Sequence, residues 1–196
     1  MNYPPKHHLD DDQNHMIEVI KTYPLATVIS VINNEPLITH LPLIFENGKL
    51  IGHIDIYNPQ AKLLKDNNEV TLIFSGPECY ISPSVYSTTQ LPTWNYIKVH
   101  LKGNVKAIES KAELKQSLIT MTEFLEAPDH KYVLEPDNPR LDRNLNYIDM
   151  FEITITEWEG KFKLSQDKKP KDTESARAEL IKANQESIKQ FLDKVF

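Results

Sequence analysis

The sequence predicts a mainly β protein with flanking helices, built as a closed or nearly closed antiparallel barrel. About six short extended runs follow one another closely, several joined by turn sequences, and helical patterns flank them. One run near residues 91–108 is long enough to return across the others. A chain of 196 residues can bury roughly 70% of its unfolded surface, so one core needs no disulfide or metal.

The first elements are a helix and three strands. The helix should begin within the acidic run 10–12 and stop before Pro24. The β-branched run 25–32 predicts a strand, the alternating run 37–44 a second, and 49–56 a third after the turn at 46–48.

Asn58-Pro59 predicts the start of a short helix, because asparagine caps and proline suits the first helical position. The apolar run 69–75 predicts a central strand that Gly76-Pro77 should end, followed by a short extended run at 79–82. A loop then leads into the long strand that starts at residue 91.

Ser110 and Glu113 form a capping box ahead of a helix to residue 127, and 128–139 should be loop. A final strand is expected at 151–160, then a basic loop and a helix over 172–195. We expect residues 1–170 to form one barrel domain and 171–196 an amphipathic helix packed on it, with packing across a dimer as the alternative. Its apolar stripe consists of Leu180, Ile181, Ile188, Phe191, Leu192 and Val195.

Composition and charge exclude several classes of protein. The net charge of −6 disfavours nonspecific binding to nucleic acid or to anionic membranes. Cys79 is the only cysteine, which excludes an intrachain disulfide and a thiolate metal cluster and fits a reducing compartment. No run of 18 apolar residues or signal-peptide core is present, so we expect a cytoplasmic protein that does not enter membranes.

Familiar catalytic and metal motifs are missing. The chain has no nucleophile elbow, no phosphate-binding glycine loop and no paired-histidine zinc motif. His40, His53 and His100 lie in separate predicted strands, so we expect no metal site, and Cys79 is better explained as a buried thiol.

Four stretches together favour a site for a flat, anionic ligand. Proline interrupts a strand at 39–43, a helix begins at 58–62, and 160–169 offers amine and amide donors. In 91–100, alternation places two aromatics and two basic residues on one face of the strand: Trp94, Tyr96, Lys98 and His100. That face could be a surface or the wall of a ligand site.

Five motifs, in order, resemble one family. They are PKH (5–7), GHxxxxNPQ (52–60), ISPSxY (81–86), PTWNYxxVH (92–100) and KxKLSQ (161–166). Over roughly residues 3–170 the chain resembles the PaiB-like family of FMN-binding negative transcriptional regulators. The resemblance implies the FMN-binding split β-barrel, related to flavin reductases and pyridoxamine-phosphate oxidase, and a homodimer with FMN at the subunit interface.

The resemblance also implies a set of FMN-binding residues. Thr39, His40 and Leu41 would lie along one side of the flavin, and Gly52 and His53 would allow its close approach. Asn58 and Gln60 would lie near the phosphate. The ring slot and its polar end would be completed, in part from the partner chain, by Ser82, Trp94, Asn95, Tyr96, Lys161, Lys163, Ser165 and Gln166.

The chain differs from the usual family pattern at Asp55, Ile56, Tyr57, Val85 and Asp167. Three functions therefore stay open: a flavin-dependent regulator or sensor, an NAD(P)H-dependent flavin oxidoreductase, and an interaction module that has lost FMN. We find no helix-turn-helix pattern, and acidic neighbours dilute the basic run at 168–171, so direct DNA contact is disfavoured.

Overall fold

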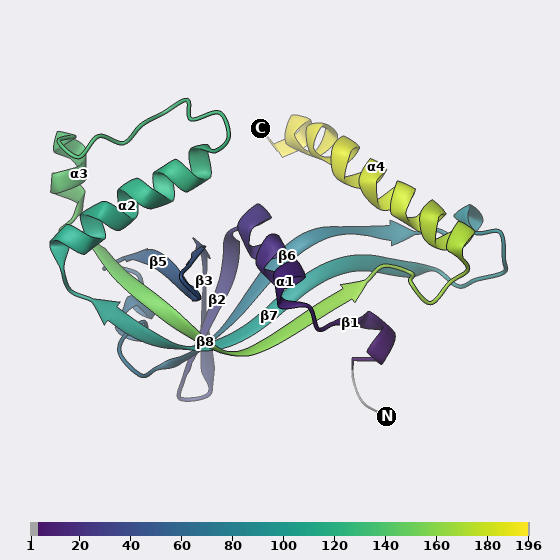
Figure 1. Cartoon of the computed structure of the whole chain (residues 1–196), viewed down its shortest axis with the longest axis horizontal. Coiled ribbons are helices and arrows are strands. Elements are labelled where there is room, and N and C mark those ends of the chain that lie inside the picture. Colours follow the sequence, from purple (N-terminus) through teal and green to yellow (C-terminus); the bar gives the residue numbers. More distant parts are fainter. Residues whose placement is uncertain (1–3, 196) are drawn as a thin grey trace. The chain divides into compact units, whose positions relative to one another are not determined.

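A computed structural model describes the backbone of residues 4–195 and the side chains of residues 4–184 (Figure 1). Four members of the predicted apolar stripe, Ile188, Phe191, Leu192 and Val195, lie outside the described side chains. The chain forms two compact units. The first comprises residues 1–19, 75–100 and 159–196, and the second comprises residues 20–74 and 101–158. The boundary that we expected at residue 170 stays a prediction.

The elements follow this order along the chain: η1 (Lys6–His8), β1 (Leu9–Asp10), α1 (Gln13–Thr22), β2 (Leu25–Ile32), β3 (Glu35–Pro42), β4 (Ile44–Glu46), β5 (Lys49–Asp55), η2 (Pro59–Lys62), β6 (Glu69–Ile81), η3 (Pro83–Val85), β7 (Thr93–Ile108), α2 (Lys111–Glu126), α3 (Pro139–Asn144), β8 (Ile148–Lys163) and α4 (Pro170–Val195).

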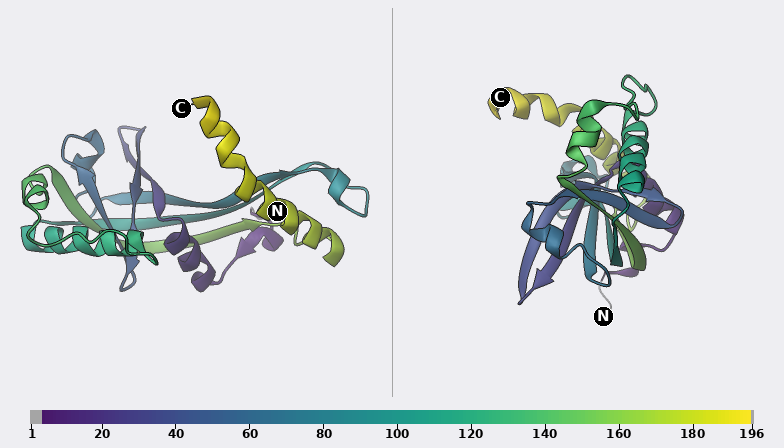
Figure 2. Two further views of the ribbon diagram at one scale, coloured as in Figure 1. Left: turned by 90° about the horizontal axis from the view of Figure 1, so that it is seen from above. Right: turned by 90° about the vertical axis from the view of Figure 1, so that its left-hand side faces the viewer.

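The second unit is built on a curved antiparallel sheet. Its strand order is β3-β2-β6-β7-β8-β5-β4. The strands at the two ends of this order, β3 and β4, are consecutive in the chain and are separated only by Leu43, which is fully buried. Since β3 also contacts β5, the sheet curls until its ends approach each other (Figure 2, right). This confirms the predicted mainly β class with flanking helices.

Local sequence explains the β2–β3 hairpin. Its turn is Asn33-Asn34, and both residues have positive φ, 53° and 64°, which asparagine tolerates better than most residues. Alternate residues of β2 are buried, beginning at Ala26, so its remaining side chains lie on the outer face.

Close packing inside this unit depends on glycine. A Cβ at Gly52 of β5 would collide with Leu43 and with the ring of Phe151, and a Cβ at Gly103 of β7 would collide with Ile153. The helices α2 and α3 belong to the same unit, and α2 buries Leu114, Ser117 and Met121. Its predicted cap is present, since the Glu113 N–H donates to Ser110 Oγ at 3.2 Å.

The first unit contains residues 75–81 of β6, 93–100 of β7 and 159–163 of β8, together with β1 and α4. Leu9 and Asp10 of β1 pair with Lys161 and Gly160 of β8. Cys79 and Ile81 of β6 pack against Ala176 of α4, which lies beside these strand ends in Figure 1. Burial, and to a lesser extent Glu179, raises the pKa of the Cys79 thiol, which suits a packed rather than a reactive cysteine.

Two predicted boundaries are wrong. Gly76-Pro77 does not end a strand, because β6 runs from Glu69 to Ile81. Its pairing with β2 stops at Ile73, so Pro77 lies where β2 no longer runs beside the strand, and a missing N–H is tolerated there. The final strand β8 is also longer than 151–160: it runs from Ile148 to Lys163 and includes the first residues of the predicted basic loop.

A short helix that follows the predicted loop 128–139 was missed. α3 begins at Pro139 and is capped by Asn138, whose Oδ1 accepts from the Arg140 N–H at 3.0 Å. The same Asn-Pro signal correctly predicted η2, so the information was present in the sequence.

Candidate functional site

Three predicted site residues of the second unit form one hydrogen-bonded network. Asn58 Nδ2 donates to Thr39 Oγ1 at 3.1 Å, and Asn58 Oδ1 accepts from the Gln60 N–H at 2.9 Å. Gln60 is buried, and its Nε2 donates to the Val28 carbonyl and to Ser30 Oγ. The proton of the Thr39 hydroxyl is left available for a ligand.

One acceptor in this network has no partner. Gln60 Oε1 is buried and makes no hydrogen bond within the part of the chain that the structure describes. A buried carbonyl oxygen in that state costs free energy, so a donor from a ligand or a water molecule would be favourable there.

The other predicted residues of this unit do not join the network. Thr39 pairs with Val28 and His40 pairs with Thr27, so His40 faces the opposite side of β3 from Thr39 and Leu41. Gly52 is explained by packing against Leu43 and Phe151. These residues therefore do not all line one surface of a flavin in this unit.

His53 contacts α2. Its Nε2 lies 3.0 Å from Ser117 Oγ, and its Nδ1 is buried without a partner among the described residues. Burial lowers the pKa of His53 to about 4, which keeps the imidazole neutral at physiological pH.

In the first unit, two predicted residues belong to a buried chain of hydroxyl and amide groups. The Tyr86 hydroxyl donates to Ser165 Oγ at 2.9 Å, and Ser165 Oγ donates to Asn95 Oδ1 at 3.1 Å. Ser165 has φ +60°, and its carbonyl accepts from Thr173 Oγ1 at 3.0 Å. These bonds hold the backbone between β8 and α4 in an uncommon conformation.

Trp94 and Tyr96 lie on the opposite face of β7 from Asn95. Trp94 is 49% exposed, and its ring centroid lies 6.3 Å from that of Tyr80 on β6. The Lys161 ammonium lies 5.6 Å from the centre of the Tyr96 ring, within cation–π range. The polar sequence of this strand therefore has two explanations: a buried hydrogen bond on one face, and partly exposed aromatic and basic side chains on the other.

The remaining predicted residues close local turns. Ser82 caps η3 by accepting from the Ser84 N–H, and Gln166 Oε1 accepts from the Leu164 N–H at 2.7 Å. Two of the residues that depart from the family pattern also have local roles. Asp55 accepts from the Tyr57 N–H at 2.8 Å, and Val85 packs on the cluster around Cys79.

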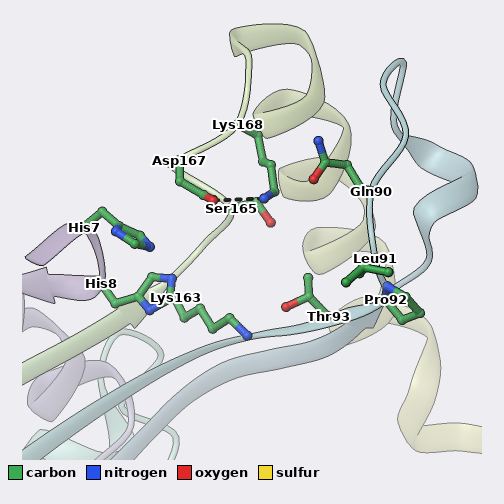
Figure 3. Close-up of a pocket in the computed structure, with 10 residues that line it drawn as sticks. All are labelled: His7, His8, Gln90, Leu91, Pro92, Thr93, Lys163, Ser165, Asp167 and Lys168. Atoms are coloured by element: carbon green, nitrogen blue, oxygen red, sulfur yellow. Dashed lines mark hydrogen bonds and ion pairs between the residues drawn. The ribbon is translucent and has the colours of Figure 1, made fainter. Parts of the chain in front are cut away.

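A pocket of about 270 Å³ opens in the first unit (Figure 3). Its lining comes from η1, from the start of β7 and the loop before it, and from the end of β8 and the turn that follows. The residues are His7, His8, Gln90, Leu91, Pro92, Thr93, Lys163, Ser165, Asp167 and Lys168. Only Lys163 and Ser165 were predicted. The signals for most of the others were the PKH motif with His8 after it, the Pro92-Thr93 start of the PTWNY motif, and Asp167 and Lys168 after KLSQ.

The family of the chain follows from comparison with known sequences. The family model described as "Putative FMN-binding domain" matches residues 2–157. The chain belongs to this FMN-binding family. A Bacillus subtilis (strain 168) protein, named protease synthase and sporulation protein PAI 2, is 29% identical over 204 residues, covering 97% of this chain and 95% of that protein. The predicted PaiB-like family and its cofactor class, FMN, are confirmed.

Solved structures support the fold of this FMN-binding chain. The FAD and heme binding protein of Mycobacterium smegmatis superposes with a TM-score of 0.66 at 14% identity, over 86% of this chain and 80% of that chain. The flavocytochrome Anf3 of Azotobacter vinelandii superposes with a TM-score of 0.63 at 20% identity, over 79% and 69%. At these identities the likeness concerns the fold alone.

Two kinds of feature are absent from the residues that the structure describes. No described helix is long and apolar enough to span a membrane. The described histidine, cysteine and acidic residues form no group of three or more that could hold a metal ion.

Proposed function

We propose that the protein is an FMN-binding homodimer that acts as a flavin-dependent regulator or sensor. The observation that carries this proposal is the family match over residues 2–157, together with the near full-length similarity to PAI 2 of Bacillus subtilis. An NAD(P)H-dependent oxidoreductase and an FMN-free module are the competing functions, and the experiments below discriminate among the three.

The chemistry of the predicted residues fits FMN. The Thr39 hydroxyl can donate to a ligand, and the buried Gln60 Oε1 needs a donor such as an N–H or hydroxyl of the cofactor. Trp94, Tyr96 and Lys161 offer aromatic surface and a positive charge. Within the second unit, Thr39 and Gln60 would hold FMN, which when bound supplies hydride and electron transfer.

A homodimer is supported by apolar side chains on the outer face of the β2–β3 hairpin. Leu25, Val31 and Ile38 on this face are 59%, 64% and 55% exposed. Ile38 pairs directly with Ile29 of β2, and Val31 pairs with Pro36 of β3, so apolar side chains of two strands lie together at this end of the face. Soluble proteins usually cover such surfaces, and a second copy of the chain is the partner that we propose.

The test of FMN binding is a titration of the purified protein with FMN, followed by flavin absorbance and fluorescence. A perturbed flavin band with saturable binding in the micromolar range is expected. Thr39→Ala and Gln60→Leu should weaken binding, whereas Thr120→Ala, which removes a partly exposed hydroxyl on α2 outside the predicted site, should not. A flavin spectrum identical to that of free FMN would instead favour the FMN-free module.

Two further measurements distinguish a sensor from an oxidoreductase and from a DNA-binding protein. Anaerobic addition of NADH or NADPH to the flavin-loaded protein should leave the flavin oxidised if the protein is a sensor, and rapid bleaching would assign it as an oxidoreductase. In a gel-shift titration at moderate salt we expect no retardation of DNA, so regulation would proceed through a ligand or a protein partner. Retardation by stoichiometric protein would show direct DNA contact.

A further inference from the structure

The pocket of the first unit contains a positive charge that its surroundings do not neutralise. Lys168 is paired with Asp167 at 2.9 Å. Lys163 has no hydrogen-bond or ion-pair partner among the side chains described for residues 4–184. In Figure 3, Lys163 extends from β8 toward Thr93 at the start of β7. The pocket's one carboxylate is thus already engaged, and the Lys163 ammonium is available for an anion.

The histidines add to this positive environment. His7 and His8 lie edge to face, with ring centroids 4.2 Å apart. The pKa of His8 is lowered from its usual value by partial burial, then by His7 and by Lys163, while Asp167 opposes the shift. Cations therefore disfavour a further positive charge on His8, and a bound anion would reverse that effect.

The rest of the pocket lining offers hydrogen-bond donors and an apolar wall. The Thr93 hydroxyl and one N–H of Gln90 are available as donors, since the Gln90 amide spends only one hydrogen bond, to Thr88 Oγ1. Ser165 is committed to Asn95 and Tyr86. Leu91 and Pro92 give an apolar wall.

The size of the pocket indicates more than a bare inorganic ion. Its volume of about 270 Å³ is roughly nine times the ~30 Å³ that one water molecule takes in the liquid. That space lies just below the ~300–1,000 Å³ that is usual for ligand pockets. It suits a small molecule whose charged end meets Lys163 and whose apolar part meets Leu91 and Pro92.

We propose that this pocket binds a small organic anion separate from FMN, with a phosphate or carboxylate head group held by Lys163 and a short apolar part against Leu91 and Pro92. Lysine acts here as a point charge, so the site does not impose the forked geometry that arginine would give. The inference goes beyond FMN binding, because only Lys163 and Ser165 of the ten lining residues belong to the set that we expect to bind FMN.

Anion binding should be linked to proton uptake by His8. The groups that face His8 are His7 of η1, Lys161 and Lys163 of β8, and Asp167 in the turn that follows. An anion beside these cations raises the pKa of His8, so affinity should increase as the pH falls between about 8 and 5. Sulfate is the probe for this measurement, since its own charge stays constant over that range.

The experiment follows the imidazole NMR signals of His7 and His8 during titration at constant ionic strength. The probes are sulfate, phenyl phosphate and benzoate, with chloride as the balancing salt. Saturable shifts are expected. Lys163→Met should weaken binding about tenfold, as expected for loss of a charge-assisted hydrogen bond. Lys169→Met removes the same charge one residue outside the lining and should change affinity less than twofold.

The probes and a second variant keep the proposal falsifiable. Stronger binding of phenyl phosphate than benzoate would identify a phosphate head group, and the reverse a carboxylate. Asp167→Asn removes the pocket's carboxylate and should tighten binding, which serves as the test if Lys163→Met does not fold.

Three results would overturn the proposal. Non-saturable shifts, or equal effects of Lys163→Met and Lys169→Met, would show that the anions act through a general ionic effect and do not bind in the pocket. One-for-one competition between phenyl phosphate and FMN would assign the pocket to the flavin phosphate instead. FMN binding itself is measured separately by flavin fluorescence, so failure of either proposal is distinguishable from failure of the other.

Discussion

At the scale of single residues, the structure brings some of the predicted site residues together and separates others. Thr39, Asn58 and Gln60 are far apart in sequence and form one network, as a shared site requires. Trp94 and Asn95 were expected in one slot, but neighbouring residues of a strand face opposite sides, so Asn95 bonds Ser165 while Trp94 packs on Tyr80. A sequence motif shows that two residues are neighbours in the chain, but it does not show that their side chains point to opposite faces of a strand.

His53 makes stability dependent on pH. Its pKa is about 4 in the folded protein, because of burial, against about 6.5 when unfolded. As the pH falls from about 6.5 to 4, the unfolded state binds a proton that the folded state does not. The free energy of unfolding should therefore drop by about 3 kcal/mol over this window because of His53.

Urea unfolding at several pH values checks this prediction. In His53→Leu the pH dependence between about 6.5 and 4 should be shallower than in the wild type by that amount. His130→Asn, at an exposed loop position with φ +45° that asparagine tolerates, is the control and should keep the wild-type slope. Equal slopes in the wild type and His53→Leu would contradict the prediction.

Asp172 should stabilise the first unit at pH values above about 4, where its carboxyl group is ionised in both the folded and the unfolded protein. Its buried carboxylate accepts from the Ser87 N–H at 2.6 Å, from Ser87 Oγ at 2.7 Å and from Thr88 Oγ1 at 2.6 Å. The bond from Thr88 and the bonds from Ser87 lower the pKa of Asp172 to about 2. Its contribution is complete above the usual aspartate pKa of about 3.9 and is lost as the pH falls to about 2.

Thermal unfolding of Asp172→Asn tests this contribution. The variant should melt below the wild type at neutral pH, and the difference should shrink as the pH approaches about 2. Asp129→Asn, whose carboxylate is exposed and paired with Lys131, should melt with the wild type throughout. A melting difference for Asp172→Asn that is constant with pH would show that the carboxylate charge is not the cause.

At the scale of elements, the extended runs were predictable because burial imposes alternation on each strand. β2 matches the predicted 25–32 residue for residue. The break expected at Gly76-Pro77 failed because tolerance of proline depends on whether a neighbouring strand needs its N–H, which only the sheet order reveals. Gly76 itself has a packing reason, since a Cβ there would lie 3.0 Å from the Ile97 side chain of β7.

Gly103 sets how closely β7 approaches β8 in the second unit. A Cβ at this position would collide with Ile153 and would lie 2.8 Å from the Thr154 carbonyl oxygen, which is backbone and cannot rotate away. Gly103→Ala should therefore destabilise the protein by about 1–3 kcal/mol, measured by urea unfolding. Asn104→Ala, at the next and exposed position of β7, should change stability by less than about 0.5 kcal/mol. An equal effect of the two substitutions would contradict close packing at Gly103.

At the scale of the whole molecule, the family and fold were predictable because motif order survives where pairwise identity is low. The arrangement of subunits could not be predicted in the same way, because it depends on surface patches that a single sequence does not identify. The outer face of the β2–β3 hairpin becomes visible only when β2 and β3 are paired and their exposed side chains are compared.

Val31→Glu should convert the proposed homodimer to a monomer. A carboxylate on this apolar face would lose its hydration on association, which opposes dimerisation by several kcal/mol without disturbing the fold. Light scattering coupled to size exclusion measures the mass. Val133→Glu introduces the same charge at a loop position with the same exposure, 64%, and should leave the mass unchanged. A Val31→Glu protein that stays dimeric would place the interface elsewhere.

The single residue between β3 and β4 limits where this fold can accept extra sequence. Added residues at the Asn33-Asn34 turn, or at Asn47-Gly48, would only enlarge a hairpin tip. One residue added beside Leu43 would move β4 by one position and turn every side chain of that strand to the opposite face. The circumference of the curled sheet is therefore fixed here by the single residue that links β3 to β4.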